Sequence, residues 1–174
     1  MQKIKWSQIL TGLIVLAAVG IMVNYLYRQP KFINGAAAPD FKIALLSGDS
    51  LQLSSLRGKF VLLDFWGSWC APCRADNPSL VALYDKHHES GLEIVSIALE
   101  TNATQWKTAI EHDNLHWQYH SSELQRMKAT LAEQYGVREI PTKYLLNRQG
   151  IIVGVNLSAD EMDKLLARMM PQKD

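Results

Sequence analysis

The chain has 174 residues, of which 48% are hydrophobic and 20% are charged, and its formal net charge is +1. This length falls in the range of a single domain and is sufficient to bury a core. The near-neutral charge gives no argument for a nucleic-acid partner, and the sequence contains no repeat or low-complexity tract. We therefore expect one globular domain that does not bind nucleic acid.

The N-terminal segment is predicted to be a membrane anchor. Residues 6–27 contain no charged side chain, and residues 9–23 are strongly apolar. About 20 such residues span the hydrocarbon core of a bilayer, and Tyr25 and Tyr27 would lie at its interface. We therefore assign residues 1–28 to a transmembrane helix.

A cleaved signal peptide is the main alternative for this segment. Residues 36–38 read Ala-Ala-Ala and resemble a cleavage site, but they lie far beyond the apolar stretch. Lys3 and Lys5 precede the stretch and two basic residues follow it, so the charges do not fix its orientation. The orientation is therefore inferred from the chemistry described below.

A domain at 38–174 is expected to follow a short tether at 29–37. A β-hairpin should open this domain, with strands at 41–46 and 51–53 joined by the turn residues 47–50. The turn residues are Ser-Gly-Asp-Ser, which suit a chain reversal.

The remaining elements are predicted to alternate between strands and helices. They are strands at 60–66, 92–98 and 117–120, helices from near Cys70, at 103–113 and at 122–135, a hairpin of 143–146 and 151–155, and a last helix with the apolar residues Met162, Leu165, Leu166 and Met169. Ser158 and Glu161 form a capping box at the start of that helix. This order predicts an α/β fold.

Cys70 and Cys73 are the only cysteines, and they form a Cys-x-x-Cys motif directly after the strand at 60–66. A structural zinc site needs about four protein ligands, so the isolated pair favours redox chemistry. A purely stabilising disulfide is the alternative, although so short a loop removes little entropy from the unfolded chain. The N-terminus of the following helix would stabilise a thiolate at Cys70.

The segment 65–74 resembles the TlpA/ResA-like thiol-disulfide oxidoreductases of the thioredoxin superfamily. Residues 38–41 resemble the opening of that family, 56–59 the lead into the active-site strand, and 139–142 the loop with the cis-proline. The resemblance covers roughly residues 36–170. It implies a thioredoxin-like, three-layer α/β fold with an N-terminal β-hairpin and a central insertion, here preceded by a transmembrane helix.

Four residues are expected to carry the chemistry. Cys70, exposed at the helix end, would attack, and the less accessible Cys73 would resolve the mixed disulfide. Asp64, on an otherwise apolar strand, resembles the buried aspartate of thioredoxin and would act as general acid or base; a hydrogen-bonded, non-catalytic aspartate is the alternative. Asp76 stands where many relatives carry glutamate, and it is either catalytic or a solvated first-turn residue.

Trp69 and Pro141 are expected to form the platform for the substrate. The resemblance implies a cis bond before Pro141, which would offer the backbone of Ile140 to an extended substrate strand and keep metal ions away from the cysteines. Trp66 is expected to be a packing residue.

The histidines do not predict a metal site. His112, His116 and His120 recur every four residues, a spacing that aligns ligands only on a continuous helix. Asp113 and Asn114 are typical of a helix end, so we expect the series to be interrupted and no metal to be bound.

The residues between the cysteines favour a reductase. Ala71 and Pro72 offer no histidine or positive charge to stabilise a thiolate, which makes the disulfide less oxidising. Arg74 acts in the opposite direction, but weakly at an exposed site. Disulfides persist outside the cytoplasm, so we expect a single-pass protein of the cell membrane whose domain faces the periplasmic side.

The resemblance implies the partners. Substrates would be oxidised envelope proteins such as apocytochrome c, and a membrane thiol carrier would supply electrons. No nicotinamide or flavin motif is present, so no cofactor is expected beyond the redox-active disulfide. The alternatives are a dithiol oxidase of DsbA type, a thiol peroxidase and a non-enzymatic module that binds peptides near Pro141. A peroxidase usually has a Thr-x-x-Cys environment, which is absent before Cys70.

Overall fold

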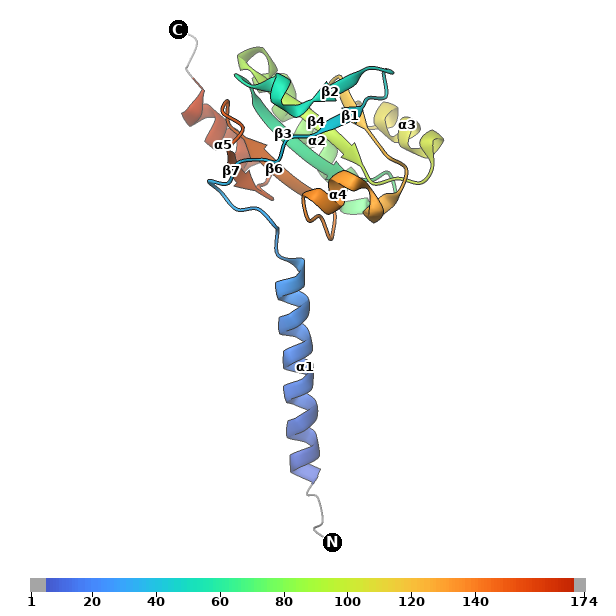
Figure 1. Ribbon diagram of the computed structural model, residues 1–174, viewed down its shortest axis with the longest axis vertical. Helices are drawn as coiled ribbons and strands as arrows, with labels where there is room; N and C mark the ends of the chain where they lie inside the picture. The colour runs from blue at the N-terminus through green and yellow to red at the C-terminus, as the bar shows by residue number, and fades with distance from the viewer. Residues whose placement is uncertain (1–5, 171–174) are drawn as a thin grey trace.

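The N-terminal helix stands apart from the rest of the molecule. The computed structural model describes residues 6–170, so Lys3 and Lys5 lie outside the described residues. Helix α1 (Trp6–Arg28) projects from one side of the domain (Figure 1). Its residues Trp6–Tyr27 are long and apolar enough to cross a membrane, and none of this stretch is buried against the domain.

A five-stranded sheet forms the centre of the domain. Its strand order is β5-β4-β3-β6-β7, with β3, β4 and β5 parallel and with β6 and β7 antiparallel to their neighbours. The strands are β3 (Phe60–Trp66), β4 (Leu92–Ala98), β5 (Tyr119–Ser121), β6 (Thr142–Leu146) and β7 (Ile152–Val155). A separate hairpin of β1 (Lys42–Ala44) and β2 (Ser50–Gln52) opens the domain.

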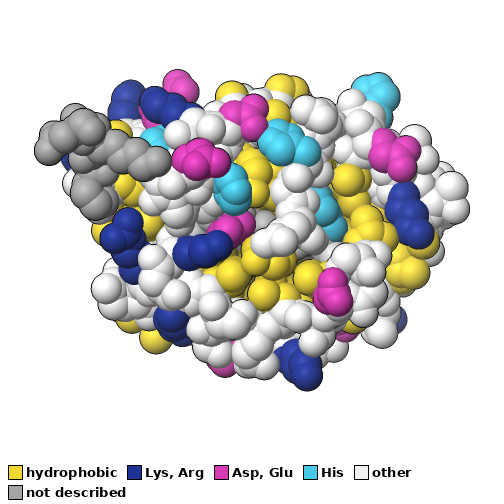
Figure 2. Space-filling view, turned by 90° about the horizontal axis from the view of Figure 1, so that it is seen from above, with side chains coloured by type: hydrophobic (Ala, Val, Ile, Leu, Met, Phe, Trp, Pro, Cys, Tyr) yellow, Lys and Arg dark blue, Asp and Glu magenta, His cyan; other side chains and the backbone are white. Residues whose placement is uncertain are grey.

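Two hydrophobic clusters cover the two faces of this sheet, which makes three layers. One cluster joins the sheet to α2 (Ala71–His87), α3 (Ala103–His112) and α5 (Ala159–Met169). The other joins it to the hairpin, a 3-10 turn at Leu53–Leu56 and α4 (Thr130–Gln134). Figure 2 shows the end of the domain opposite α1, where acidic, basic and histidine side chains are interspersed.

Strand β3 supplies both clusters because its side chains alternate between the two faces. Leu62 and Trp66 belong to the cluster under α2, whereas Leu63 and Phe65 belong to the other. Asp64 is in register with the first set, so it lies on the face that carries α2.

The second half of the segment 29–37 is attached to the domain. Ala37 forms a β-bridge with Ile151, and the N–H of Gly35 donates to the carbonyl of Ile152 at 2.8 Å. The ring of Phe32 packs edge-on against Tyr135, with 5.7 Å between the ring centroids. The free part of the tether is therefore shorter than its sequence range.

The expected three-layer α/β fold with its N-terminal hairpin is confirmed, but the helix predicted at 122–135 is wrong. The chain there forms a 3-10 turn at Arg126–Lys128 and the short α4. Leu124 and Arg126 have φ angles of 54° and 51°, which a continuous right-handed helix does not allow. The carboxylate of Glu123 accepts from the N–H groups of residues 130 and 131 and so caps α4 instead.

Two smaller predictions need correction. The strand predicted at 117–120 is β5, which begins two residues later and ends one residue later than predicted. Met169 was expected on the apolar face of the last helix, but it is 39% exposed because α5 ends there. Met162 and Leu166 are buried as predicted, and the capping box of Ser158 is present.

Candidate active site

A disulfide between Cys70 and Cys73 lies at the start of α2. Strand β3 ends at Trp66, a short loop follows, and Cys70 is the N-cap residue of α2. The backbone N–H of Cys73 points at Cys70 Sγ, 3.3 Å away. The sulfur that was predicted to attack therefore lies at the positive end of a helix, as the sequence indicated.

Both cysteines are well covered in this oxidised state. Cys70 is 5% exposed and Cys73 is 2% exposed, so the prediction of an exposed Cys70 is wrong here. The carbonyl oxygen of Ile140 lies 3.7 Å from Cys70 Sγ and contributes to this cover. A substrate must therefore approach Cys70 next to the loop that contains Ile140.

The expected platform residues surround the disulfide. The peptide bond between Ile140 and Pro141 is cis, which confirms the expectation. Trp69 is 47% exposed, and its Nε1 donates to the carbonyl of Leu99 at 2.9 Å, which fixes the ring beside the active-site loop. The structure thus brings Trp69, Ile140 and Pro141 together around Cys70.

The active-site loop is anchored to the end of β4. The backbone N–H of Ser68 donates to the carboxylate of Glu100, which is 1% exposed. The backbone N–H of Arg126 donates to the carbonyl of Glu100 at 3.0 Å. Glu100 therefore links the loop before Cys70 to the irregular segment that replaces the predicted helix.

Asp64 is buried behind the disulfide helix. It is 1% exposed, and Ser96 Oγ lies 3.4 Å from its carboxylate as a donor. Burial raises the pKa of Asp64 to about 6, although the charge of Lys143 and the hydrogen bond from Ser96 act in the opposite direction. A carboxyl with this pKa exchanges protons near neutral pH, as a general acid or base requires.

Lys143 connects Asp64 with Asp76. It is the cross-strand partner of Asp64 between β3 and β6, and its Nζ forms an ion pair with the carboxylate of Asp76 on α2. The side chain of Lys143 is 7% exposed and that of Asp76 is 29% exposed. Burial lowers the pKa of Lys143, while the charge of Asp64 opposes this effect. Asp76 is therefore a partner of a buried lysine rather than a solvated residue.

Arg74 is engaged by Asp113 rather than by the disulfide. Its Nη2 donates to the Asp113 carboxylate at 2.6 Å, its Nε contacts the same carboxylate, and its Nη1 donates to the carbonyl of Ser68 at 3.3 Å. Burial raises the pKa of Asp113, but hydrogen bonds from Arg74, His112 and Asn77 outweigh it and bring the pKa to about 2. The positive charge near Cys70 is therefore already compensated.

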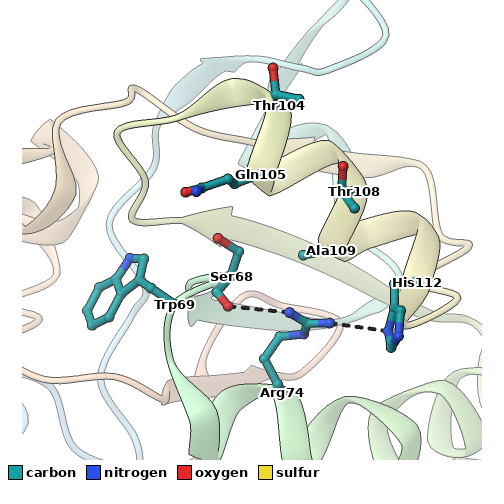
Figure 3. A pocket seen from close by; sticks show the side chains of 8 residues that line it. All are labelled: Ser68, Trp69, Arg74, Thr104, Gln105, Thr108, Ala109 and His112. Carbon is teal, nitrogen blue, oxygen red and sulfur yellow. Dashed lines mark hydrogen bonds between the residues drawn. The ribbon is translucent and has the colours of Figure 1, made fainter.

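A cavity of about 520 Å³ opens beside this ion pair (Figure 3). Figure 3 shows Arg74 between Ser68 and His112, with α3 forming the opposite wall. The lining residues come from the active-site loop, the first turn of α2 and α3: Ser68, Trp69, Arg74, Thr104, Gln105, Thr108, Ala109 and His112.

The three histidines lie on different elements. His112 ends α3, and His116 Nε2 pairs with Asp85 at 2.8 Å. His120, on β5, stacks on Trp117 with 5.6 Å between the ring centroids. No group of three or more metal-ligating side chains occurs within residues 6–170.

The comparisons with known proteins agree with this geometry. The model of the AhpC/TSA family matches residues 34–155. A thiol-disulfide oxidoreductase ResA of Bacillus anthracis is 32% identical over 143 residues, which is 81% of this chain and 80% of the relative. The chain belongs to the AhpC/TSA family. Within it, the chain is a thiol-disulfide oxidoreductase of the ResA type, which confirms the resemblance of its motifs.

A second relative and a solved structure extend this result. The oxidoreductase is 31% identical to ResA of Oceanobacillus iheyensis over 176 residues, or 95% of this chain and 86% of that protein. The thioredoxin domain of a thiol-disulfide oxidoreductase from Bacteroides vulgatus matches it with a TM-score of 0.74 at 27% identity. That match covers 81% of this chain and 100% of the solved domain.

Sequence reasoning missed three residues of this oxidoreductase's site. Lys143 lies two residues after Pro141 and is the one charged residue of its strand, so the argument that singled out Asp64 also applies to it. Asp113 was read only as part of a helix end, and its pairing with Arg74 has no local signal. Glu100 lies two residues after the end of β4, at the sheet edge where ligands of α/β proteins bind, and that position could have drawn attention to it.

Proposed function

We propose that this oxidoreductase is a membrane-anchored protein-disulfide reductase whose domain faces the extracytoplasmic side. The observation that carries the proposed direction is the environment of Cys70 Sγ. One backbone N–H, that of Cys73, points at it, and the carbonyl oxygen of Ile140 lies 3.7 Å away. A carbonyl disfavours a neighbouring thiolate, and weak thiolate stabilisation makes a disulfide less oxidising.

The compensated charge of Arg74 supports the same direction. Its guanidinium is held by both carboxylate oxygens of Asp113 and does not act as an isolated cation beside the sulfur. The residues between the cysteines are alanine and proline, which add no donor to the thiolate. The reduced pair should therefore be a ready electron donor rather than a strong oxidant.

The reaction would proceed through a mixed disulfide. The thiolate of Cys70 attacks one sulfur of a substrate disulfide, the substrate S–S bond breaks, and the departing thiolate takes a proton from water. Asp64 then accepts the proton of Cys73, whose thiolate attacks Cys70 Sγ and breaks the mixed disulfide; the second substrate sulfur leaves as a thiolate and takes a proton from water, and Asp64 releases its proton to water. Two electrons pass to the substrate, and the Cys70–Cys73 disulfide remains.

Residues of the platform would position the substrate. An extended peptide can pair with the backbone of Ile140, as in the addition of a strand to a sheet edge, while Trp69 offers an exposed aromatic surface. The cysteine of the substrate would then lie over Cys70. Oxidised envelope proteins such as apocytochrome c are the proposed substrates, and a membrane thiol carrier would reduce the disulfide again.

Trapping of the mixed disulfide tests this function. Full-length chain reconstituted in nanodiscs and reduced beforehand is mixed with a disulfide-linked peptide, and the products are separated by mass. Wild type should release two peptide thiols, Cys73→Ser should accumulate the mixed disulfide, and Cys70→Ser should be inert. Consumption of peroxide at a comparable rate would favour the peroxidase. Unchanged peptide binding and phenotype in Cys70→Ser would favour the non-enzymatic module.

A further inference from the structure

We propose that the disulfide is held on the side of the domain that faces the bilayer, so that it exchanges with disulfides at the lipid surface. This inference rests on the membrane anchoring proposed above. It adds that the domain has a fixed orientation relative to the bilayer, whereas a flexible tether would let the domain rotate.

The first contact connects the anchor with the loop over the disulfide. The guanidinium of Arg138 lies 3.8 Å from the ring centroid of Tyr27, in the last turn of α1. Arg138 stands two residues before Ile140, a span of at most about 7 Å. The carbonyl of Ile140 is in turn 3.7 Å from Cys70 Sγ. The end of α1 and the sulfur are thus joined by one side chain and one short stretch of backbone.

A second contact also connects the surroundings of the disulfide with the end of α1. The guanidinium of Arg126 lies 5.0 Å from the ring centroid of Trp69, next to Cys70 in the sequence. The next residue, Met127, lines a cavity of about 400 Å³ together with Tyr27 and Arg138. Two separate segments of the domain therefore place the surroundings of the disulfide beside the end of the membrane helix.

The short connection between helix and domain limits rotation of the domain. After α1 ends at Arg28, Lys31 Nζ already donates to the carbonyl of Gln134 at 2.9 Å. Only Gln29 and Pro30 separate these points, and the ring of proline restricts the backbone. Figure 1 shows that α1 leaves the domain on the side of α4 and the loop that follows it.

The charges near the end of α1 suit a lipid surface. Two basic side chains lie there: Lys31 contacts Gln134 just after the helix, and Arg138 lies on the ring of Tyr27. Glu133 lines the same cavity and offsets part of this positive charge. The opposite end of the domain carries both signs interspersed (Figure 2).

A disulfide attached to a lipid headgroup tests this orientation. Reduced full-length chain is placed in nanodiscs that contain phosphatidylethanolamine with a pyridyl disulfide on its headgroup. Cys70 attacks the lipid-linked sulfur and releases pyridine-2-thione, which absorbs light; Cys73 then displaces the lipid thiol and closes the disulfide. Soluble dipyridyl disulfide measures the intrinsic reactivity of the same pair.

Insertion of about 20 Gly and Ser residues between Gln29 and Pro30 should lower the rate with the lipid reagent about tenfold, because the sulfur is no longer held at the surface. The rate with the soluble reagent should stay within about twofold.

Arg138→Gln should also lower the rate with the lipid reagent, whereas Arg168→Gln, on the exposed side of α5, should not. An unchanged or higher lipid rate after the insertion would overturn the inference, since that is how a domain facing away responds. A chain that does not enter nanodiscs, or that fails with the soluble reagent, contradicts the proposed function itself and the inference with it.

Discussion

The two faces of the sheet perform different tasks. The cluster under α2 contains both cysteines, together with Trp66 and Leu80, and the carboxyl of Asp64 lies on this side. The cluster on the other face contains no cysteine, and Phe32 from the segment after α1 packs against it. Chemistry is therefore concentrated on one face, whereas the other attaches the domain to the membrane helix.

Neighbouring residues in one strand serve both tasks. In β3, Leu63 and Phe65 enter the cluster that supports attachment, while the residue between them, Asp64, lies behind the disulfide. Burial of a charge network such as Asp64 with Lys143 rarely adds stability over apolar packing. We infer that this network is kept for the reaction.

Matched truncations of one leucine on each face should separate stability from chemistry. Leu53 is 0% exposed in the attachment cluster, and Leu80 is 1% exposed in α2. Each change to alanine should lower the free energy of unfolding by about 2–5 kcal/mol. Only Leu80→Ala should also slow disulfide exchange, because it loosens the helix that carries the cysteines. Urea titration and exchange rates under native conditions measure the two effects. Equal slowing by Leu53→Ala would remove the distinction between the faces.

Asp64 should give the disulfide face a characteristic pH dependence. The resolving step should accelerate as pH rises through about 6, and Asp64→Asn should remove this inflection and slow the step about 100-fold. Asp76→Asn retains Asp64 and should keep an inflection. Stopped-flow measurement of thiol release between pH 5 and 8, roughly the range in which such a group titrates, gives the profile. An inflection that survives in Asp64→Asn would assign the proton to another group.

The same pKa predicts an effect on stability. Because burial raises the pKa of Asp64 from its ordinary value of 3.8 to about 6, the folded chain binds this proton more tightly than the unfolded chain. The contribution of Asp64 to stability is therefore greatest below about pH 4 and is lost as the pH rises through about 6. Asp64→Asn should be more stable than wild type at pH 8, by on the order of 2 kcal/mol.

The Arg74–Asp113 pair should have the opposite pH dependence. The pKa of Asp113 is about 2, so its contribution is present above about pH 4 and is lost as the pH falls toward 2. Asp113→Asn should cost about 2 kcal/mol at pH 7 and become neutral in acid. Asp85→Asn, in the more exposed pair with His116, should cost under about 1 kcal/mol. Acid unfolding curves that stay parallel for Asp113→Asn would rule out this role.

Much of the fold could be predicted because it follows local patterns. The apolar run of β3, the capping box at Ser158 and the turn chemistry near Gly48 each specify an element from adjacent residues. The segment after β5 could not be predicted, since its composition suits a helix. Its shape depends on Glu123 capping α4 and on the left-handed backbone of Arg126, which are tertiary features.

The same limit applies to the site. Cys70 and Cys73 are identified by their spacing, and Pro141 by its motif, so both could be found without coordinates. The ion pair between Asp76 and Lys143 could not be predicted, because the two residues are far apart in the sequence. The pairing of β3 with β6 brings them together. Likewise, the contact of Arg138 with Tyr27 requires the fold. Sequence therefore predicts the reacting atoms better than their surroundings.

The equilibrium reduction potential of the Cys70–Cys73 pair tests the central claim most directly. The full chain in nanodiscs is equilibrated with dithiothreitol or glutathione buffers, and the reduced fraction is measured by alkylation. A sulfur that faces a carbonyl and lacks an unpaired cation should give a value near that of thioredoxin, about −270 mV. A value near that of DsbA, about −120 mV, would contradict the account and make the protein an oxidase.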